Sequence, residues 1–244
     1  MTQMLLEIEG LDKRFGGLHA VKQLSLRVAK GEIVGILGPN GAGKTTFFNL
    51  LTQFIAPDSG RIEFKGQSLR GLKPHRVVAL GVARTFQLCR PFPGLSVLEN
   101  VLVGSLGPRV HHTDLVERAK HLLEQVGLAS KADTAAELLS YGDQRRLEIA
   151  RALATEPELL LLDEPFAGLG SAEIEAISAL IRKLHAEKQL TILLIEHKLR
   201  EFMQLVSRVI VLDFGEQIAD GTPQQVVENP RVIEAYIGKQ GATP

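Results

Sequence analysis

The amino-acid sequence predicts an α/β fold in which a mixed or parallel sheet alternates with helices. Three short, almost entirely apolar runs have the length of buried strands, and they span residues 32–37, 159–162 and 191–195. A fourth run at 209–212 has the same character, and a helix is expected over about 172–187. The chain has 244 residues, of which 45% are hydrophobic, which is enough for one large domain or a domain with a subdomain.

Two further regions surround these strands. Short alternating segments at residues 6–9, 24–28 and 61–64 predict an antiparallel β subdomain, with a turn at 57–60. From about 88 to 156 the pattern becomes helical, which predicts an inserted α-helical subdomain. Within it we expect Thr113 to cap a helix that ends at Gly127, and Pro223 and Pro230 fit the first turns of two short C-terminal helices.

The segment 38–45 matches the P-loop pattern G-x-x-x-x-G-K-[ST] without a mismatch, between an expected strand and a helix expected over 44–54. Glycines let successive N–H groups face one anion, and the helix N-terminus adds partial positive charge. Lys44 is expected to reach the β- and γ-phosphates of a nucleoside triphosphate, and the Thr45 hydroxyl to bind Mg²⁺. A glycine turn without a ligand is the alternative. The expected nucleotide-binding residues are Gly38, Pro39, Asn40, Gly41, Ala42, Gly43, Lys44, Thr45 and Thr46.

Composition argues against a nucleic-acid-binding protein, a membrane-spanning protein and a disulfide-bonded protein. Lys plus Arg and Asp plus Glu both total 28, giving a formal net charge of zero and no indication of nucleic-acid binding. No apolar run approaches the roughly 18 residues that span a bilayer, so a membrane role is expected to need a partner. The single cysteine, Cys89, excludes an internal disulfide.

A second motif narrows the nucleotide-binding class. Residues 139–153, LSYGDQRRLEIARAL, resemble the signature segment of the ABC (ATP-binding cassette) ATPases, usually LSGGQ followed by a helix ending in ARAL. Tyr141 replaces a glycine and Asp143 replaces the glutamine, whereas Ser140 and Gly142, which the resemblance places at the γ-phosphate, are intact. Gln144 is assigned to the same binding segment. A simple helix cap would explain Ser140 alone.

The resemblance continues in order along the chain. Residues 159–164, LLLLDE, are similar to the Walker B strand, which makes Asp163 a ligand of the phosphate-bound Mg²⁺ and Glu164 the general base for the attacking water. Gln87 occupies the Q-loop position, where its amide oxygen would reach the metal. His197 matches the switch histidine that contacts the γ-phosphate, and the resemblance makes Glu164, His197 and Lys44 the catalytic group.

Two other positions depend on the family match. Phe15 sits where the family stacks an aromatic ring on adenine, although an ordinary core phenylalanine is the alternative. Residues 167–170 fall at the D-loop, which touches a second subunit in the family, and Gly170 replaces the usual acidic or amide residue there. The resemblance therefore leaves open the hydrogen bond that this side chain would make across a dimer.

The resemblance implies one P-loop ABC ATPase domain over 1–244, with the helical signature subdomain inserted at 88–156. It implies a head-to-tail pair with a second ATP-binding subunit, identical or sister, in which Ser140 and Gly142 of one subunit complete the ATP site of the other. ATP with Mg²⁺ would drive transmembrane permease subunits from the cytoplasmic side of the membrane. The segment 88–101 is a candidate docking surface for a permease helix, with internal packing as the alternative.

Within the family, the chain is similar to ATP-binding subunits of branched-chain amino acid importers and their urea and amide relatives. The features that carry this are RTFQ at 84–87, the LSYG form of the signature, IEH at 195–197 and the ending at 229–238. Such importers also work with a solute-binding protein. An ATPase of lipopolysaccharide export and a soluble ABC ATPase that never touches a membrane are the alternatives.

Overall fold

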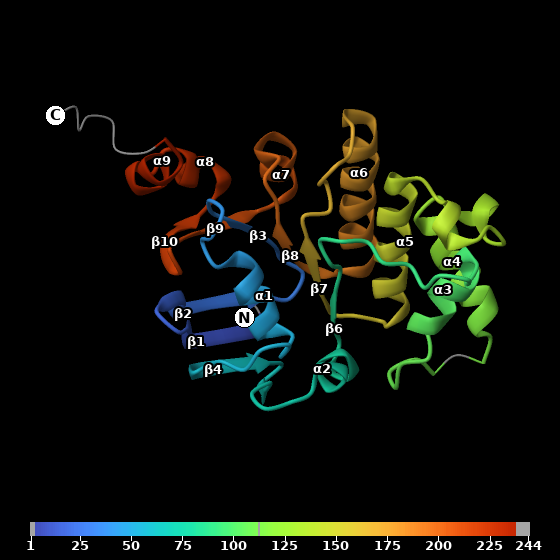
Figure 1. Cartoon of the computed structure of the whole chain (residues 1–244), viewed down its shortest axis with the longest axis horizontal. Helices are drawn as coiled ribbons and strands as arrows, with labels where there is room; N and C mark the ends of the chain where they lie inside the picture. Colours follow the sequence, from blue (N-terminus) through green and yellow to red (C-terminus); the bar gives the residue numbers. More distant parts are fainter. Residues whose placement is uncertain (1–2, 112, 238–244) are drawn as a thin grey trace. The chain divides into compact units, whose positions relative to one another are not determined.

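The computed structural model describes residues 3–111 and 113–237 (Figure 1). The chain forms two compact units, one made of residues 1–74 and 191–244 and the other of residues 75–190. The last residue of the 229–238 pattern lies outside the described residues.

The first unit contains an antiparallel sheet near the N-terminus with strand order β2-β1-β4-β5 (Figure 1). Its strands are β1 (Met4–Phe15), β2 (Leu18–Ala29), β4 (Ser59–Phe64) and β5 (Gln67–Ser68). β1 and β2 are joined by a tight turn at Gly16, whose φ of 55° favours glycine. The expected antiparallel β subdomain is confirmed, with longer strands than the alternating segments indicated.

The same unit holds the parallel strands that carry the P-loop. β3 (Ile33–Leu37) lies between β8 (Thr191–Ile195) and β9 (Arg208–Asp213), parallel to both, and β10 (Glu216–Gly221) is antiparallel to β9. All residues of β3 and β8 are buried, as their almost entirely apolar composition predicts. Gly35 of β3 packs against the ring of Phe202 in α7 (Leu199–Leu205), where an added Cβ would lie 2.0 Å from the ring.

Helix α1 (Lys44–Leu51) follows β3 and is shorter than the expected 44–54. It ends because Thr52 Oγ1 donates to the Phe48 carbonyl and Gln53 takes a left-handed φ of 56°. The two C-terminal helices, α8 (Pro223–Val227) and α9 (Pro230–Ile237), begin at the expected prolines. Both contact β10.

The second unit is mainly helical. It contains α2 (Pro74–Leu80), α3 (Val97–Gly104), α4 (Leu115–Gln125), α5 (Tyr141–Ala154) and α6 (Ser171–Lys188), with 3₁₀ turns at Ala129–Lys131 and Ala136–Leu138. Helices α3, α4 and α5 pack on one another. β6 (Val82–Arg84) runs parallel to β7 (Leu159–Asp163), and the carboxyl ends of both strands lead into residues of the candidate site.

One expected cap is wrong. The helix expected after Thr113 is capped by Asp114, whose carboxylate accepts a hydrogen bond from the Glu117 backbone N–H at 2.9 Å. Asp is at least as good a cap as Thr, and Asp114 directly precedes the first helical residue. The elements that the sequence did not predict, α2, α7, β5, β6 and β10, are short, and the periodic signal over so few residues is weak.

Candidate functional site

The P-loop lies in the first unit, between β3 and α1, and its backbone requires glycine at two points. Gly38 and Gly43 have φ angles of 152° and 99°. An added Cβ at Gly38 would lie 2.2 Å from the Leu212 carbonyl oxygen, and one at Gly43 would lie 2.2 Å from that of Ala20. The loop is therefore curled against neighbouring backbone that leaves no room for side chains.

Lys44 begins helix α1, and its ammonium group turns back over the loop. Nζ donates to the carbonyl oxygens of Gly38 at 2.6 Å and Pro39 at 3.0 Å. The side chain is buried, while the neighbouring Thr45 is exposed and Thr46 is half-buried. The first turn of α1 has no acidic residue, so no carboxylate of that turn offsets the positive end of the helix. This arrangement favours an anion at the loop.

C-terminal elements bind the P-loop backbone at two points. The Gly38 N–H donates to the Tyr236 hydroxyl of α9 at 2.9 Å, and the Gly215 N–H donates to the Ala42 carbonyl at 3.1 Å. Burial raises the pKa of Tyr236, so the hydroxyl stays protonated at neutral pH. Sequence reasoning missed Tyr236, because nothing local in the sequence links it to a loop 198 residues earlier.

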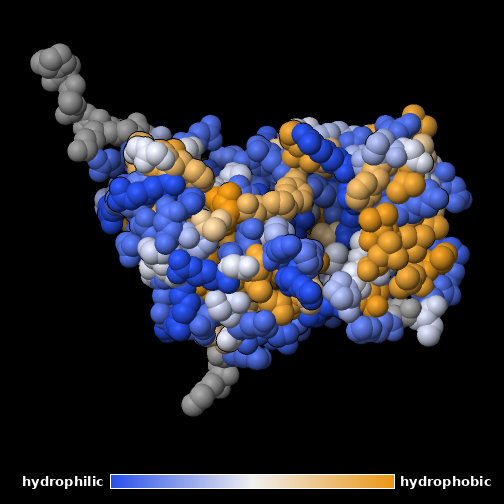
Figure 2. All heavy atoms as spheres, turned by 60° about the horizontal axis from the view of Figure 1, so that its bottom comes forward, coloured by the Kyte–Doolittle hydropathy of each residue, from blue (hydrophilic) through white to orange (hydrophobic). Residues whose placement is uncertain are grey.

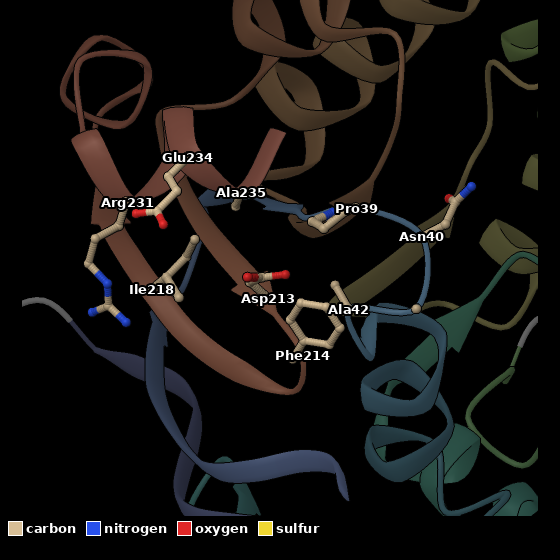
Figure 3. Close-up of a pocket in the computed structure, with 10 residues that line it drawn as sticks. Pro39, Asn40, Ala42, Asp213, Phe214, Ile218, Arg231, Glu234 and Ala235 are labelled. Carbon is tan, nitrogen blue, oxygen red and sulfur yellow. The ribbon is translucent and has the colours of Figure 1, made fainter. Parts of the chain in front are cut away.

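A cavity of about 500 Å³ lies between the loop and these C-terminal elements (Figure 3). Asp213 and Phe214, at the end of β9, face Ala42 of the loop, and α9 contributes Glu234 and Ala235. The remaining lining residues are Pro39, Asn40, Gly41, Ile218 and Arg231. The C-terminal segment thus forms one wall of a hollow whose other wall is the P-loop.

Phe15 and His197 also belong to the first unit, and both are exposed. Phe15 is 45% exposed at the end of β1, with Lys13 Nζ 5.4 Å from the centroid of its ring. An ordinary core position for this ring is therefore excluded. His197 follows β8, and its backbone N–H donates to the carboxylate of the buried Glu196 at 2.8 Å.

Asp163 ends β7 in the second unit and is paired with Arg84 of β6. Arg84 Nη2 donates to Asp163 Oδ2 at 2.6 Å, and both side chains are buried, with 5% and 2% exposure. The Asp163 backbone N–H donates to Thr85 Oγ1 at 3.2 Å. Burial raises the pKa of Asp163, and the hydrogen bond from Arg84 opposes that rise. Arg84 is a second residue that sequence reasoning did not single out.

The structure brings Gln87 and Glu164 together. Gln87 Nε2 donates to Glu164 Oε2 at 3.0 Å. Glu164 has a left-handed φ of 50°, unusual for a residue with a side chain, directly after Asp163. Backbone conformations of this kind collect at functional sites, where the surroundings hold them in place.

Ser140 caps helix α5, so the capping alternative for this residue is realised. Its Oγ accepts from the Asp143 N–H at 3.2 Å, and Asp143 in turn pairs with Lys131. Gly142 is buried in the first turn, where an added Cβ would lie 2.3 Å from Glu173 Oε1. Gln144 Nε2 donates to the Leu139 carbonyl at 3.2 Å. A well-formed helix N-terminus therefore presents the signature residues.

The segment 88–101 contains both buried and exposed apolar residues. Ser96 forms a capping box with Glu99, and Val97 and Val101 of α3 are fully buried, as internal packing requires. Leu88 and Phe92 are 66% and 41% exposed. Figure 2 shows apolar side chains gathered at the surface of the helical part, at the right of its view.

Two features are absent from residues 3–111 and 113–237. No helix there is both long and apolar enough to cross a bilayer. Within that same part of the chain, no group of three or more His, Cys, Asp or Glu side chains is placed to hold a metal ion by itself.

Comparison with known proteins shows which families and relatives this chain matches. Residues 21–167 match the family model of ABC transporters, and residues 216–242 match that of the branched-chain amino acid ATP-binding cassette transporters. Among relatives, the branched-chain amino acid transport ATP-binding proteins BraF of Pseudomonas aeruginosa and LivG of Escherichia coli K12 are 42% and 44% identical, each over 98% of this chain and 100% of its own length. The lipopolysaccharide export ATP-binding protein LptB of Acidithiobacillus ferridurans is 36% identical over 97% of this chain and 98% of its own.

Two solved structures of ATP-binding cassettes are similar to this structure. The ADP conformation of MJ1267, an ATP-binding cassette of an ABC transporter, has a TM-score of 0.89 at 33% identity over 98% of this chain and all of its own. A dimeric post-hydrolysis cassette, MJ0796 with ADP and Pi, has a TM-score of 0.81 at 27% identity over 90% of this chain and 99% of its own. The chain therefore belongs to the ATP-binding cassette family of ABC transporters, and within it to the branched-chain amino acid transport ATP-binding proteins.

Proposed function

We propose that this chain binds and hydrolyses ATP as the energy-supplying subunit of an importer of branched-chain amino acids or related small solutes. The observation that carries the proposal is the P-loop, in which Gly38 and Gly43 cannot accept a Cβ and Lys44 is turned over the loop. This is the cradle that a triphosphate needs, in a chain that shares 42–44% of its residues with branched-chain amino acid transport ATP-binding proteins.

Nucleotide phosphates can replace the backbone carbonyls that now accept hydrogen bonds from Lys44. Lys44 now donates to two backbone carbonyls, and phosphate oxygens would replace them with charged, stronger acceptors. The N-terminus of α1 adds positive potential at the same point. His197 and the exposed ring of Phe15 are proposed to contact the γ-phosphate and the adenine, respectively.

Mg²⁺ would be held by the Thr45 hydroxyl, the Gln87 amide oxygen and the Asp163 carboxylate, which are the hard oxygen donors that this ion prefers. When bound, the ion would neutralise charge on the phosphates. Asp163 suits the role because Arg84 keeps its buried carboxylate hydrogen-bonded and oriented. Arg84 donates to Oδ2 of the carboxylate, and because each oxygen of a carboxylate can accept more than one interaction, the pair and a metal are compatible.

Glu164 is proposed as the general base, and Gln87 positions its carboxylate through the 3.0 Å hydrogen bond. We expect Glu164→Gln to slow hydrolysis about a thousandfold, equivalent to about 4 kcal/mol of transition-state stabilisation, with ATP binding largely kept. The measurement is single-turnover hydrolysis beside fluorescent-nucleotide titration. A variant that turned over near the wild-type rate would remove Glu164 from this role.

The proposed working form is a head-to-tail pair of ATP-binding subunits, identical or sister, in which Ser140, Gly142 and Gln144 of one subunit reach the nucleotide on the other. A dimeric cassette exists among the similar structures, in a state bound to ADP and Pi. Gly170 offers no side chain to the partner, so any contact there would come from its backbone. Transmembrane permease subunits would dock from the cytoplasmic side, with a solute-binding protein on the other.

Import is favoured over lipopolysaccharide export by the match of residues 216–242 to the branched-chain amino acid model and by the higher identity to BraF and LivG than to LptB. The test is ATP hydrolysis by the chain reconstituted with its permease in vesicles. Stimulation by a solute-binding protein loaded with leucine supports import. An ATPase rate that does not change when the loaded binding protein is added contradicts import. Failure to form a complex with any permease would favour a soluble ABC ATPase.

A further inference from the structure

Arg145 of helix α5 is a buried cation attached to the main chain of the Q-loop, defined here as residues 86–89. Its side chain is only 2% exposed. Nη1 donates to the Phe86 carbonyl at 2.9 Å, and Nη2 donates to the Gln87 carbonyl at 2.6 Å. The planar guanidinium holds two successive peptide groups at fixed angles, which a lysine ammonium could not do.

A second side chain of the same helix face completes the attachment. Glu148 lies one turn after Arg145, and its Oε1 accepts from the Phe86 N–H at 2.6 Å. Its Oε2 accepts from the Cys89 thiol at 3.2 Å and lies 3.4 Å from Arg145 Nη1. The helix that begins with the signature thus binds the Q-loop through both the N–H and the carbonyl of Phe86.

Tyr141, which replaces a glycine of the signature pattern, joins this arrangement. Its hydroxyl accepts from Arg145 Nη2 at 2.8 Å, and its ring centroid lies 5.2 Å from the guanidinium carbon. The ring also lies against Gly168 of the D-loop, where φ is 75° and an added Cβ would be 2.9 Å from the ring. Tyr141 therefore contacts the D-loop and Arg145 at the same time.

We propose that Arg145 is a positioning residue that, with Tyr141, fixes the Q-loop and the D-loop to the signature helix within one subunit. Its target is the Gln87 side chain, which the anchored backbone places 3.0 Å from Glu164. The inference rests on the proposed function, because it explains how Gln87 and Glu164 are held for hydrolysis. It also gives a physical reason for a tyrosine in this signature: the hydroxyl and ring occupy a space between two loops that glycine would leave empty.

The variants are Arg145→Lys, which keeps the charge and loses the fork, and Tyr141→Phe, which removes one hydroxyl from a 41% exposed side chain. Arg146→Lys is the matched control, because Arg146 lies on the same helix and its guanidinium pairs with Asp143, at 3.8 Å. We expect Arg145→Lys to lower kcat by roughly tenfold or more and Tyr141→Phe by about threefold. The Kd for ATP, set by the P-loop, should change less than about twofold.

Two measurements separate positioning from simple structural support. In a double-mutant cycle with Gln87→Ala, Arg145→Lys should lower kcat little further, because both changes remove the same contact to Glu164. Alkylation of native Cys89 should be faster in Arg145→Lys, because its Q-loop is released, and unchanged in Arg146→Lys. Additive losses of kcat, or an unchanged alkylation rate, would overturn the inference.

The outcome also distinguishes the inference from the proposed function. If the wild-type chain with its permease does not hydrolyse ATP, or if Glu164→Gln is fully active, the proposed function fails. If the wild type hydrolyses ATP and depends on Glu164, but the cycle is additive, only the role of Arg145 fails. Should Arg145→Lys unfold, the milder Tyr141→Phe carries the same cycle with Gln87→Ala.

Discussion

The thiol of Cys89 offers a direct test of how tightly the Q-loop is packed. Cys89 is the only cysteine among the 244 residues, so alkylation of the native protein reports one position. Burial, reinforced by the charge of Glu148, raises its pKa from 9.0 to about 12. Because only the thiolate reacts, and a pKa three pH units higher leaves about a thousandfold less thiolate at pH 8, native alkylation should be about a thousandfold slower than in the unfolded chain.

The assay is iodoacetamide labelling followed by intact-mass spectrometry, in buffer and in 6 M guanidinium chloride, with Cys89→Ser as the unlabelled control. The rate in denaturant should level off above pH 9, whereas the native rate should keep rising toward pH 12. Native labelling at pH 8 within about tenfold of the denatured rate would refute the packing of Cys89 against Glu148.

Three further outcomes follow from single contacts. Tyr236→Phe keeps the ring but loses the acceptor for the Gly38 N–H, so the Kd for ATP should rise about fivefold by fluorescence titration, with no change in the exposed α9 control Ile233→Ala. Gly38→Ala would place a Cβ 2.2 Å from the Leu212 carbonyl, and urea unfolding should show a loss of about 2 kcal/mol or more together with ATP binding. Ser96→Ala removes the capping box of α3 and should lower the free energy of unfolding by about 1 kcal/mol in the same assay, with the Kd for ATP unchanged. A change in ATP affinity without a change in stability would contradict this prediction.

The sequence predicted those parts of the fold whose signals are local. The buried strand 191–195 was placed to the residue, because a short and almost entirely apolar run that stops at the charged Glu196 leaves little choice of ends. The P-loop was predicted for a similar reason, since strand, glycine turn and helix are consecutive in the chain. The prediction of Thr113 as the cap was wrong because two adjacent residues could each cap the helix, and the sequence pattern does not fix which of them directly precedes the first helical residue.

The sequence by itself thus determined the chemistry that this chain offers: a phosphate loop with Lys44, an acidic pair at Asp163 and Glu164, and a signature segment of one family. Only the tertiary structure decided how those groups are held. Arg84 meets Asp163 across 79 residues, Arg145 meets Gln87 across 58, and Tyr236 meets Gly38 across 198. The physical reason is that motifs record local backbone geometry, whereas the partner of a buried charge or an orphan N–H is chosen by whichever distant segment folding brings beside it.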